Sequence, residues 1–309
     1  MSVRRRSFIA VAVAVAATAA ALAPTLAVAA PARSAGPPVG PRTGLTISNG
    51  SPWVLENGSW VDFHTDVRDL AWNPTGTKAV FVDGRGDLDV AGPDGRGRVV
   101  VAKNPGGQTW SHPTWVVPPA HYGDPAAKAQ LIFVAAKHGV TRLESVPATG
   151  RLSTPTAVPL SGNFGGPDVP QTGNVWPNAA RGGGEIVYDN PHTGEVYIHD
   201  DYLRQQGDAM FRGSEPALLS TPGEFEVVFV RSVAGRDHLF ENSWTAATGK
   251  EVLRDLTPHT TVDCTEPAFS PDGRTIAFRT PNGVYTMGDR GSSGPVRFST
   301  FKGLPAYRA

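Results

Sequence analysis

The chain has 309 residues, and its 28 lysines and arginines balance 28 aspartates and glutamates, so the formal charge is zero. A neutral surface argues against nucleic acid or an anionic membrane as the partner, because both attract strongly basic proteins. The single cysteine, Cys264, excludes an intramolecular disulfide. We predict that Cys264 is a buried, inert side chain.

Residues 1–29 are predicted to be a signal peptide that is removed on export. Three arginines at positions 4–6 precede an apolar stretch, and Ala27-Val28-Ala29 supplies the small residues of a cleavage site. The segment 5–9 also resembles a twin-arginine signal, so the Sec and twin-arginine routes both remain open. Cleavage removes three arginines and no acidic residue, which shifts the formal charge to −3. We expect an extracellular or cell-envelope protein without stable membrane insertion after cleavage.

Residues 30–42 are rich in proline, alanine and glycine, and we predict a disordered linker there. Beyond it, strands are expected near 45–47, 53–55 and 60–63. The last two flank Asn-Gly, which is the strongest short signal for a β-hairpin. We interpret this segment as a degenerate first repeat or its outer part, within a single domain that spans 43–309.

Five clearer repeats follow, each with short strands separated by Gly, Pro, Asp and Asn. Their entry strands are expected to centre on Trp72, Trp115, Trp176, Leu218 and Phe269, and their second strands on Phe81, Phe133, Tyr188, Phe229 and Phe278. The third of these repeats shows no good outer strand, and we find no long helical pattern. Stacked four-stranded blades would bury these aromatic residues against one another, and closing the ring leaves only short edges exposed.

The repeat from Pro267 to Phe278 reads Pro-Ala-Phe-Ser-Pro-Asp-Gly and ends in an Ile-Ala-Phe strand, and Ala71 to Asp89 has the same frame. These segments resemble the PD40 repeat of TolB-like, WD40-like β-propellers. The resemblance implies an all-β fold, a single propeller of four-stranded antiparallel blades, with six blades as in TolB. Five blades with the N-terminal hairpin as a closing strap is the alternative. Because the first repeat begins soon after the signal peptide, we expect no TolB-type α/β domain, and TolB's partner is not carried over.

Alignment of the repeats on their entry strands places five residues at one position, three residues before each anchor. They are Asp69, His112, Gly173, Glu215 and Glu266. This position is expected near one mouth of the propeller channel, so we take Asp69, His112, Glu215 and Glu266 as a candidate ligand ring. The structural alternative is that each side chain only hydrogen-bonds backbone groups of its own or the next blade.

No motif predicts a metal or a cofactor. Asp83, Asp87 and Asp89 superficially resemble a calcium loop but lack the EF-hand spacing. The eight histidines show no zinc-ligand spacing, and no Gly-x-Ser-x-Gly elbow, P-loop or dinucleotide fingerprint occurs.

These observations favour an exported, monomeric, non-catalytic propeller that binds a protein, peptide or cell-envelope ligand. The alternative is a propeller enzyme, a hydrolase or lyase that acts on a glycan or lactone. Such an enzyme would use carboxylates at the channel mouth, for which Asp69, Glu215 and Glu266 are the candidates.

Overall fold

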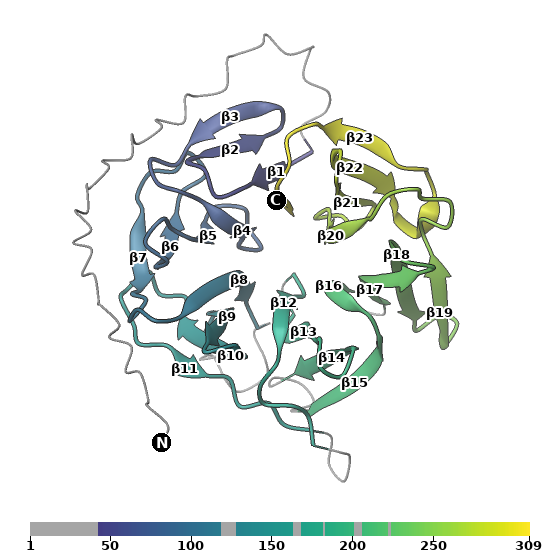
Figure 1. Ribbon diagram of the computed structural model, residues 1–309, viewed down its shortest axis with the longest axis horizontal. Helices are drawn as coiled ribbons and strands as arrows, with labels where there is room; N and C mark the ends of the chain where they lie inside the picture. Colours follow the sequence, from purple (N-terminus) through teal and green to yellow (C-terminus); the bar gives the residue numbers. More distant parts are fainter. Residues whose placement is uncertain (1–42, 119–127, 163–167, 182, 201–205, 222–223) are drawn as a thin grey trace, which may run out of the picture. The chain divides into compact units, whose positions relative to one another are not determined.

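The computed structural model describes residues 43–118, 128–162, 168–181, 183–200, 206–221 and 224–309. The predicted signal peptide (1–29) and linker (30–42) lie outside these residues. Within the unit Ala35–Ala309, the strands form six four-stranded antiparallel sheets, arranged as blades around a central channel (Figure 1). Over the described residues the one helical element is the 3₁₀ turn η1 (Asp289–Gly291). No described helix has the length and apolar character needed to cross a membrane.

Blades 2 to 6 are continuous segments whose four strands run in chain order from the channel to the rim. Blade 2 contains β4 (Arg68–Trp72), β5 (Ala79–Val82), β6 (Leu88–Ala91) and β7 (Val99–Ala102). Blade 3 contains β8 (Thr109–Val116), β9 (Gln130–Lys137), β10 (Val140–Pro147) and β11 (Thr156–Ala157). Blade 4 contains β12 (Val175–Ala179), β13 (Glu185–Asn190), β14 (Glu195–Asp200) and β15 (Gln206–Arg212). Blade 5 contains β16 (Ser214–Thr221), β17 (Glu224–Val233), β18 (Arg236–Thr245) and β19 (Lys250–Asp255). Blade 6 contains β20 (Thr265–Phe269), β21 (Thr275–Thr280), β22 (Gly283–Gly288) and β23 (Val296–Ser299).

Blade 1 joins the two ends of the described chain. Its outer strands are β1 (Leu45–Ser48), β2 (Trp53–Glu56) and β3 (Ser59–Asp62), and its innermost strand is β24 (Leu304–Tyr307). Thr46 pairs with Ala306 across this seam, and the Thr46 hydroxyl donates to the Ala306 carbonyl at 2.8 Å. Residues 45–62 therefore form the outer part of a blade, which is one of the two interpretations that the sequence allowed for this segment. Six blades are confirmed, and the alternative of five blades with a strap is wrong.

The aromatic residues of the second strands form the packing between blades, as predicted. Phe81, Phe133, Tyr188, Phe229 and Phe278 are each at most 1% exposed. Such strands are buried on both faces, because each blade is covered by the next, and their central residues are therefore apolar. The entry-strand anchors Trp72 and Trp115 are also buried, each with 9% exposure.

Two details of blade 4 differ from the prediction. The strand anchor is Ala179, not Trp176, because Trp176 occupies the bulge between Val175 and Asn178, the position that Asp69 has between Arg68 and Ala71 in β4. The missing outer strand exists as β15, whose Phe211 pairs with Val196 of β14. Its sequence lacks an alternating pattern, so only the pairing with β14 identifies it as a strand.

Candidate functional site

The innermost strand of each of blades 2 to 6 contains a β-bulge at its beginning. At each bulge one residue other than glycine has a left-handed backbone. These bulge residues and their φ angles are Asp69 (56°), His112 (49°), Trp176 (55°), Glu215 (51°) and Glu266 (54°). A positive φ is uncommon for residues other than glycine, so its recurrence marks a built feature of the ring. The structure thus places all four predicted ring residues at equivalent positions, and Trp176 takes the place assigned to Gly173.

A proline follows the bulge residue in four of these strands, and blade 1 has the matching Pro305 in β24. Innermost strands are sheet edges, and bulges and edges are the places in a sheet where proline fits. Leu304-Pro305-Ala306-Tyr307 is therefore a sixth copy of the Pro-Ala-aromatic frame, paired in regular register and without a bulge. The sequence prediction overlooked this copy, although its signal is plain in the chain.

Carboxylates at and beside the bulges link three pairs of neighbouring blades. The His112 N–H donates to Asp69 Oδ2 at 3.1 Å, and the Glu266 N–H donates to Glu215 Oε2 at 2.7 Å. Trp176 has no acceptor to offer blade 5, so Asp189 of β13 accepts the Glu215 N–H at 3.1 Å instead. The bulge N–H groups of His112, Glu215 and Glu266 are thus satisfied by the preceding blade. Asp69 and Glu215 therefore have the structural role that was the alternative to ligand binding, since each accepts a backbone N–H of the next blade.

The same carboxylates influence one another across the mouth of the channel. Burial raises the pKa of Glu266 to about 7; Arg279 opposes the rise, and the charges of Glu215 and Asp69 add to it. Burial also raises the pKa of Glu215. Arg279 contacts Glu266 Oε1 at 2.5 Å, while Oε2 is buried without a hydrogen-bond partner in the described structure. Three carboxylates from blades 2, 5 and 6 therefore converge at one end of the channel, which we call the acidic mouth.

An aromatic pair completes the acidic mouth. The rings of His112 and Trp176 lie with centroids 3.9 Å apart and planes at 37°. Burial, helped by the charge of Arg68, lowers the pKa of His112 against the opposing effect of Asp69. The imidazole is therefore neutral near pH 7, and the pair presents aromatic surface next to carboxylates, a combination that favours a cationic group.

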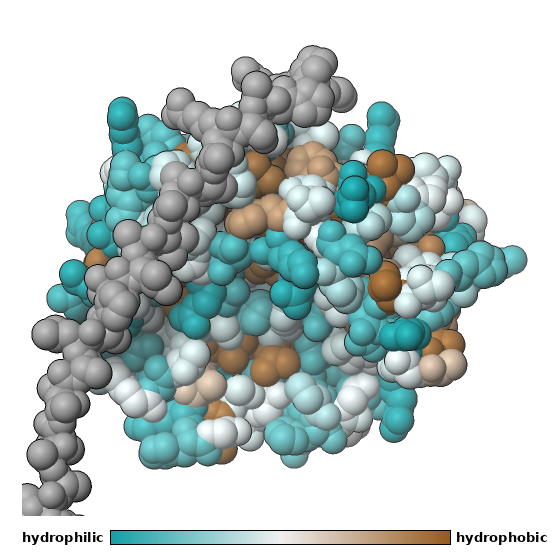
Figure 2. All heavy atoms as spheres, turned by 45° about the horizontal axis from the view of Figure 1, so that its top comes forward, coloured by the Kyte–Doolittle hydropathy of each residue, from teal (hydrophilic) through white to brown (hydrophobic). Residues whose placement is uncertain are grey.

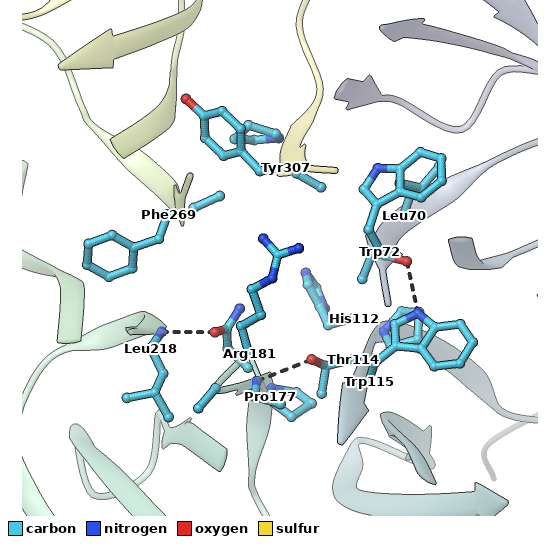
Figure 3. A pocket seen from close by; sticks show the side chains of 18 of the residues that line it. Leu70, Trp72, His112, Thr114, Trp115, Pro177, Arg181, Leu218, Phe269 and Tyr307 are labelled. Atoms are coloured by element: carbon cyan, nitrogen blue, oxygen red, sulfur yellow. Dashed lines mark hydrogen bonds between the residues drawn. The ribbon is translucent and has the colours of Figure 1, made fainter. Parts of the chain in front are cut away.

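The channel itself is narrow, with a cavity of about 170 Å³ lined by residues of the innermost strands. Arg181, from the turn after β12, extends into it from blade 4 (Figure 3) and donates to the Pro74 carbonyl in the turn after β4 of blade 2. Since blades 4 and 2 are not neighbours, this side chain spans the channel. Burial lowers the Arg181 pKa. No local motif marks Arg181, because only ring closure brings it to the channel.

Hydrogen bonds between neighbouring innermost strands fix the wall of the channel. The Trp115 indole N–H donates to the Ala71 carbonyl at 3.1 Å, and the Ala179 N–H donates to Thr114 Oγ1 at 3.2 Å (Figure 3). The residues of the acidic mouth thus rest on a rigid ring, and this holds a binding geometry in place.

The acidic loop 83–89 and Cys264 have structural roles. Asp83 Oδ1 accepts the N–H groups of Arg85 and Asp87, and Asp89 Oδ2 contacts Arg98 at 2.6 Å. The loop is therefore organised by its own backbone and one arginine. Cys264 is buried, as predicted, and burial raises the pKa of its thiol, which disfavours the reactive thiolate.

Comparisons with known proteins agree with the class defined by this geometry, a six-bladed β-propeller. No family model and no curated protein matches the chain. Among solved structures, the Cps50 (Swd1) β-propeller domain of Myceliophteria thermophila is similar with a TM-score of 0.51 and 14% identity, over 86% of this chain and 88% of that one. An oligogalacturonate lyase in complex with manganese has a TM-score of 0.44 and 12% identity, over 80% of this chain and 70% of that one. The oligogalacturonate lyase of Vibrio parahaemolyticus has a TM-score of 0.44 and 10% identity, over 84% and 80%. At these identities the likeness shows the fold alone.

Proposed function

We propose that the protein is an exported, non-catalytic β-propeller that binds a protein, peptide or cell-envelope ligand through a cationic group of that ligand. The observation that carries the proposal is the convergence of Asp69, Glu215 and Glu266 from three blades on the acidic mouth. The His112–Trp176 pair beside them offers the aromatic contact that a cation prefers.

The charge balance at the mouth favours a positively charged ligand. The charges of Asp69 and Glu215 act on Glu266, and Arg279 is the cation that contacts Glu266, the most buried of the three. Because His112 is neutral, a lysine or arginine side chain, or an amino terminus, would relieve the remaining repulsion. Of the three carboxylates, Asp69 lines the channel cavity of about 170 Å³, together with His112 and Trp176, whereas Glu215 and Glu266 lie outside its lining. This volume suits a single side chain or chain end, since pockets for whole small-molecule ligands usually reach ~300 Å³ or more.

Two wider hollows at the same end of the blades support a macromolecular partner. A hollow of about 700 Å³ lies between blades 4 and 5, lined by residues that include Asp189, Arg212 and Asp237. Another of about 530 Å³ lies against the loops of blades 2 and 3, lined by residues that include Asp66 and Arg85. The surface in view in Figure 2 intersperses hydrophilic and hydrophobic residues, a mixture typical of non-obligate interfaces.

Export and membership of the TolB-like PD40 propellers are part of the proposal. The signal-peptide pattern of residues 1–29 supports export, and the Pro-Ala-aromatic frame, now present in β24 as well, supports the family. N-terminal sequencing of the chain recovered from culture medium or envelope should begin at Ala30. A chain that retains Met1 in a membrane fraction would contradict cleavage.

A capture experiment tests the binding function. The chain 30–309 serves as bait for culture supernatant and envelope fractions, beside a Glu215→Gln/Glu266→Gln double variant. Glutamine keeps the shape and the acceptor for the Glu266 N–H, so only charge is lost. We expect a ligand that the first bait retains and the variant loses, and whose retention falls as salt rises. Identical capture by both baits would reject recognition at the acidic mouth.

One observation favours an enzyme as the second candidate. A carboxyl group with a pKa of about 7, as for Glu266, is poised for general acid–base chemistry near neutral pH, and Glu215 is its neighbour. Both groups already have structural partners, in a backbone N–H and Arg279. Turnover of a glycan or lactone by the mature chain, abolished in Glu266→Gln, would establish this function in place of simple binding.

A further inference from the structure

A second acidic cluster lies between blades 5 and 6. Glu226 of β17 and Glu241 of β18 come from blade 5, and Asp289 of η1 comes from blade 6. One carboxylate oxygen of each lies within 4.8 Å of those of the other two. Glu241 is fully buried and Glu226 is 1% exposed. The cluster is separate from the acidic mouth, and the proposed function makes no use of it.

The arginines around the cluster leave two of its oxygens unsatisfied. Arg254 contacts Glu241 Oε1 and Oε2 at 3.3 and 3.2 Å, whereas Arg290 reaches Glu226 Oε2 and Asp289 Oδ2 only at 3.4 and 3.5 Å. Glu226 Oε1 and Asp289 Oδ1 are buried and have no hydrogen-bond partner among the described residues. A buried carboxylate oxygen without a partner is strongly unfavourable, so the cluster needs a positive ligand.

Two ligands fit this need, a proton or a metal ion. A proton shared between the carboxyl groups would satisfy these oxygens in the absence of a metal. A hard divalent cation satisfies the same oxygens, because carboxylates are its preferred ligands. Calcium–oxygen distances of about 2.3–2.6 Å allow ligand oxygens on one ion to lie up to roughly 5 Å apart, which matches the spacing of the cluster.

We propose that Glu226, Glu241 and Asp289 bind a Ca²⁺ ion that links blade 5 to blade 6. The neighbouring arginines do not block the ion: the Arg254 and Arg290 side chains are each 40% exposed and can turn toward solvent. Water completes the coordination from the side of Asp289, whose side chain is 20% exposed. The ion thereby joins two strands of one blade to a turn of the next.

Calorimetric titration and thermal unfolding of the mature chain, stripped with EDTA, test the site. We expect Ca²⁺ to bind at one site per chain and to raise the melting temperature. Glu226→Gln and Asp289→Asn should each weaken Ca²⁺ binding at least about tenfold, since even lesser changes around a metal have effects of this size. Asp289 lies in a surface turn, so its variant remains informative if Glu226→Gln fails to fold.

Asp89→Asn is the matched control. Asp89 is also fully buried and also has an oxygen without a partner, but it lies outside the cluster, in blade 2. This variant should retain the full response to Ca²⁺. The proposal is overturned if Ca²⁺ gives neither heat nor a shift in melting temperature, or if the cluster variants respond as the unaltered chain does. An equal response to Mg²⁺ would overturn the assignment to calcium.

Discussion

At the scale of single residues, three of the five bulge residues, Asp69, Glu215 and Glu266, combine a left-handed backbone with an acidic side chain. A left-handed backbone at a residue other than glycine costs of order 1–3 kcal/mol, so it persists only where the surroundings hold it. Asp69 and Glu215 each provide such support by accepting the N–H of the next bulge residue. These carboxylates therefore stabilise the ring and at the same time place negative charge at its mouth.

Replacement of Trp72 tests how much a single buried aromatic residue stabilises the fold. Its ring is buried at 9% exposure, its indole N–H donates to Thr46 Oγ1 at 3.0 Å, and Arg308 lies over its face. Trp72→Ala should lower the free energy of unfolding by about 3–5 kcal/mol, the usual effect of truncating a large buried aromatic residue. Urea denaturation measures this value.

Trp244→Ala is the matched control, because Trp244 is 41% exposed. Its effect should stay within about 0.5 kcal/mol, as for most surface substitutions. Equal losses in the two variants would contradict the assignment of Trp72 to the core between blades 1 and 2.

At the scale of elements, β24 closes the ring. All four residues of β1 pair with β24, and beyond it Arg308 contacts Glu56 at 2.7 Å and the Gly76 carbonyl at 2.8 Å. Without β24, blade 1 would expose the edge of β1 to the channel, and the ring would open between blades 1 and 6.

Deletion of residues 303–309 should therefore abolish cooperative unfolding or lower the melting temperature far more than deletion of Ala309 alone. Calorimetry of both truncated chains measures the difference. Similar melting curves for the two would contradict closure through β24.

The sequence predicts local elements of this fold better than their partners. Aromatic residues, glycine turns and short β-branched runs identify most strands because these signals are local. The repeat alignment gives the wrong anchor for β12. The anchor is the small residue Ala179, and Trp176, which the alignment chose, occupies the bulge. β15 is recognised as a strand by its pairing with β14 rather than by pattern, whereas β24 does carry the Pro-Ala-aromatic frame and was overlooked.

In the candidate site, too, some residues are predictable from the sequence and others are not. The repeat alignment predicts that Asp69, His112, Glu215 and Glu266 occupy equivalent positions, because the periodic frame is local. Arg181 reaches the channel from a turn without any motif, and the cluster of Glu226, Glu241 and Asp289 comes from three separate elements. Such contacts depend on how the blades stack, which no single repeat encodes.

At the scale of the whole molecule, several carboxyl groups are buried at or between blades with raised pKa values. Burial is the main cause for each of them: Asp89 (about 6), Asp189 (about 7), Glu226 (about 9) and Glu266 (about 7). In the unfolded chain such groups titrate near pH ~4. Between that pH and the raised values, the folded protein holds protons that the unfolded chain has released.

The stability of the metal-free protein should therefore fall as the pH rises from about 4 to about 9. The sign follows because the folded state binds more protons than the unfolded state throughout this window. Melting temperatures in EDTA across the pH series measure the effect. A melting temperature that rises over the same range would show that these carboxyl groups are ionised in the folded protein.

The central claim is that the acidic mouth binds a cationic ligand. The most direct test is the dissociation constant of the captured ligand, or a peptide carrying its basic residue, for three proteins. These are the unaltered chain, the Glu215→Gln/Glu266→Gln variant, and Glu251→Gln as a control on the exposed outer strand β19. We predict that the double variant keeps its melting behaviour, binds about tenfold or more weakly, and loses most of the salt dependence, while the control binds normally. Unchanged affinity in a folded double variant would contradict the claim and leave the carboxylates only their role in joining the blades.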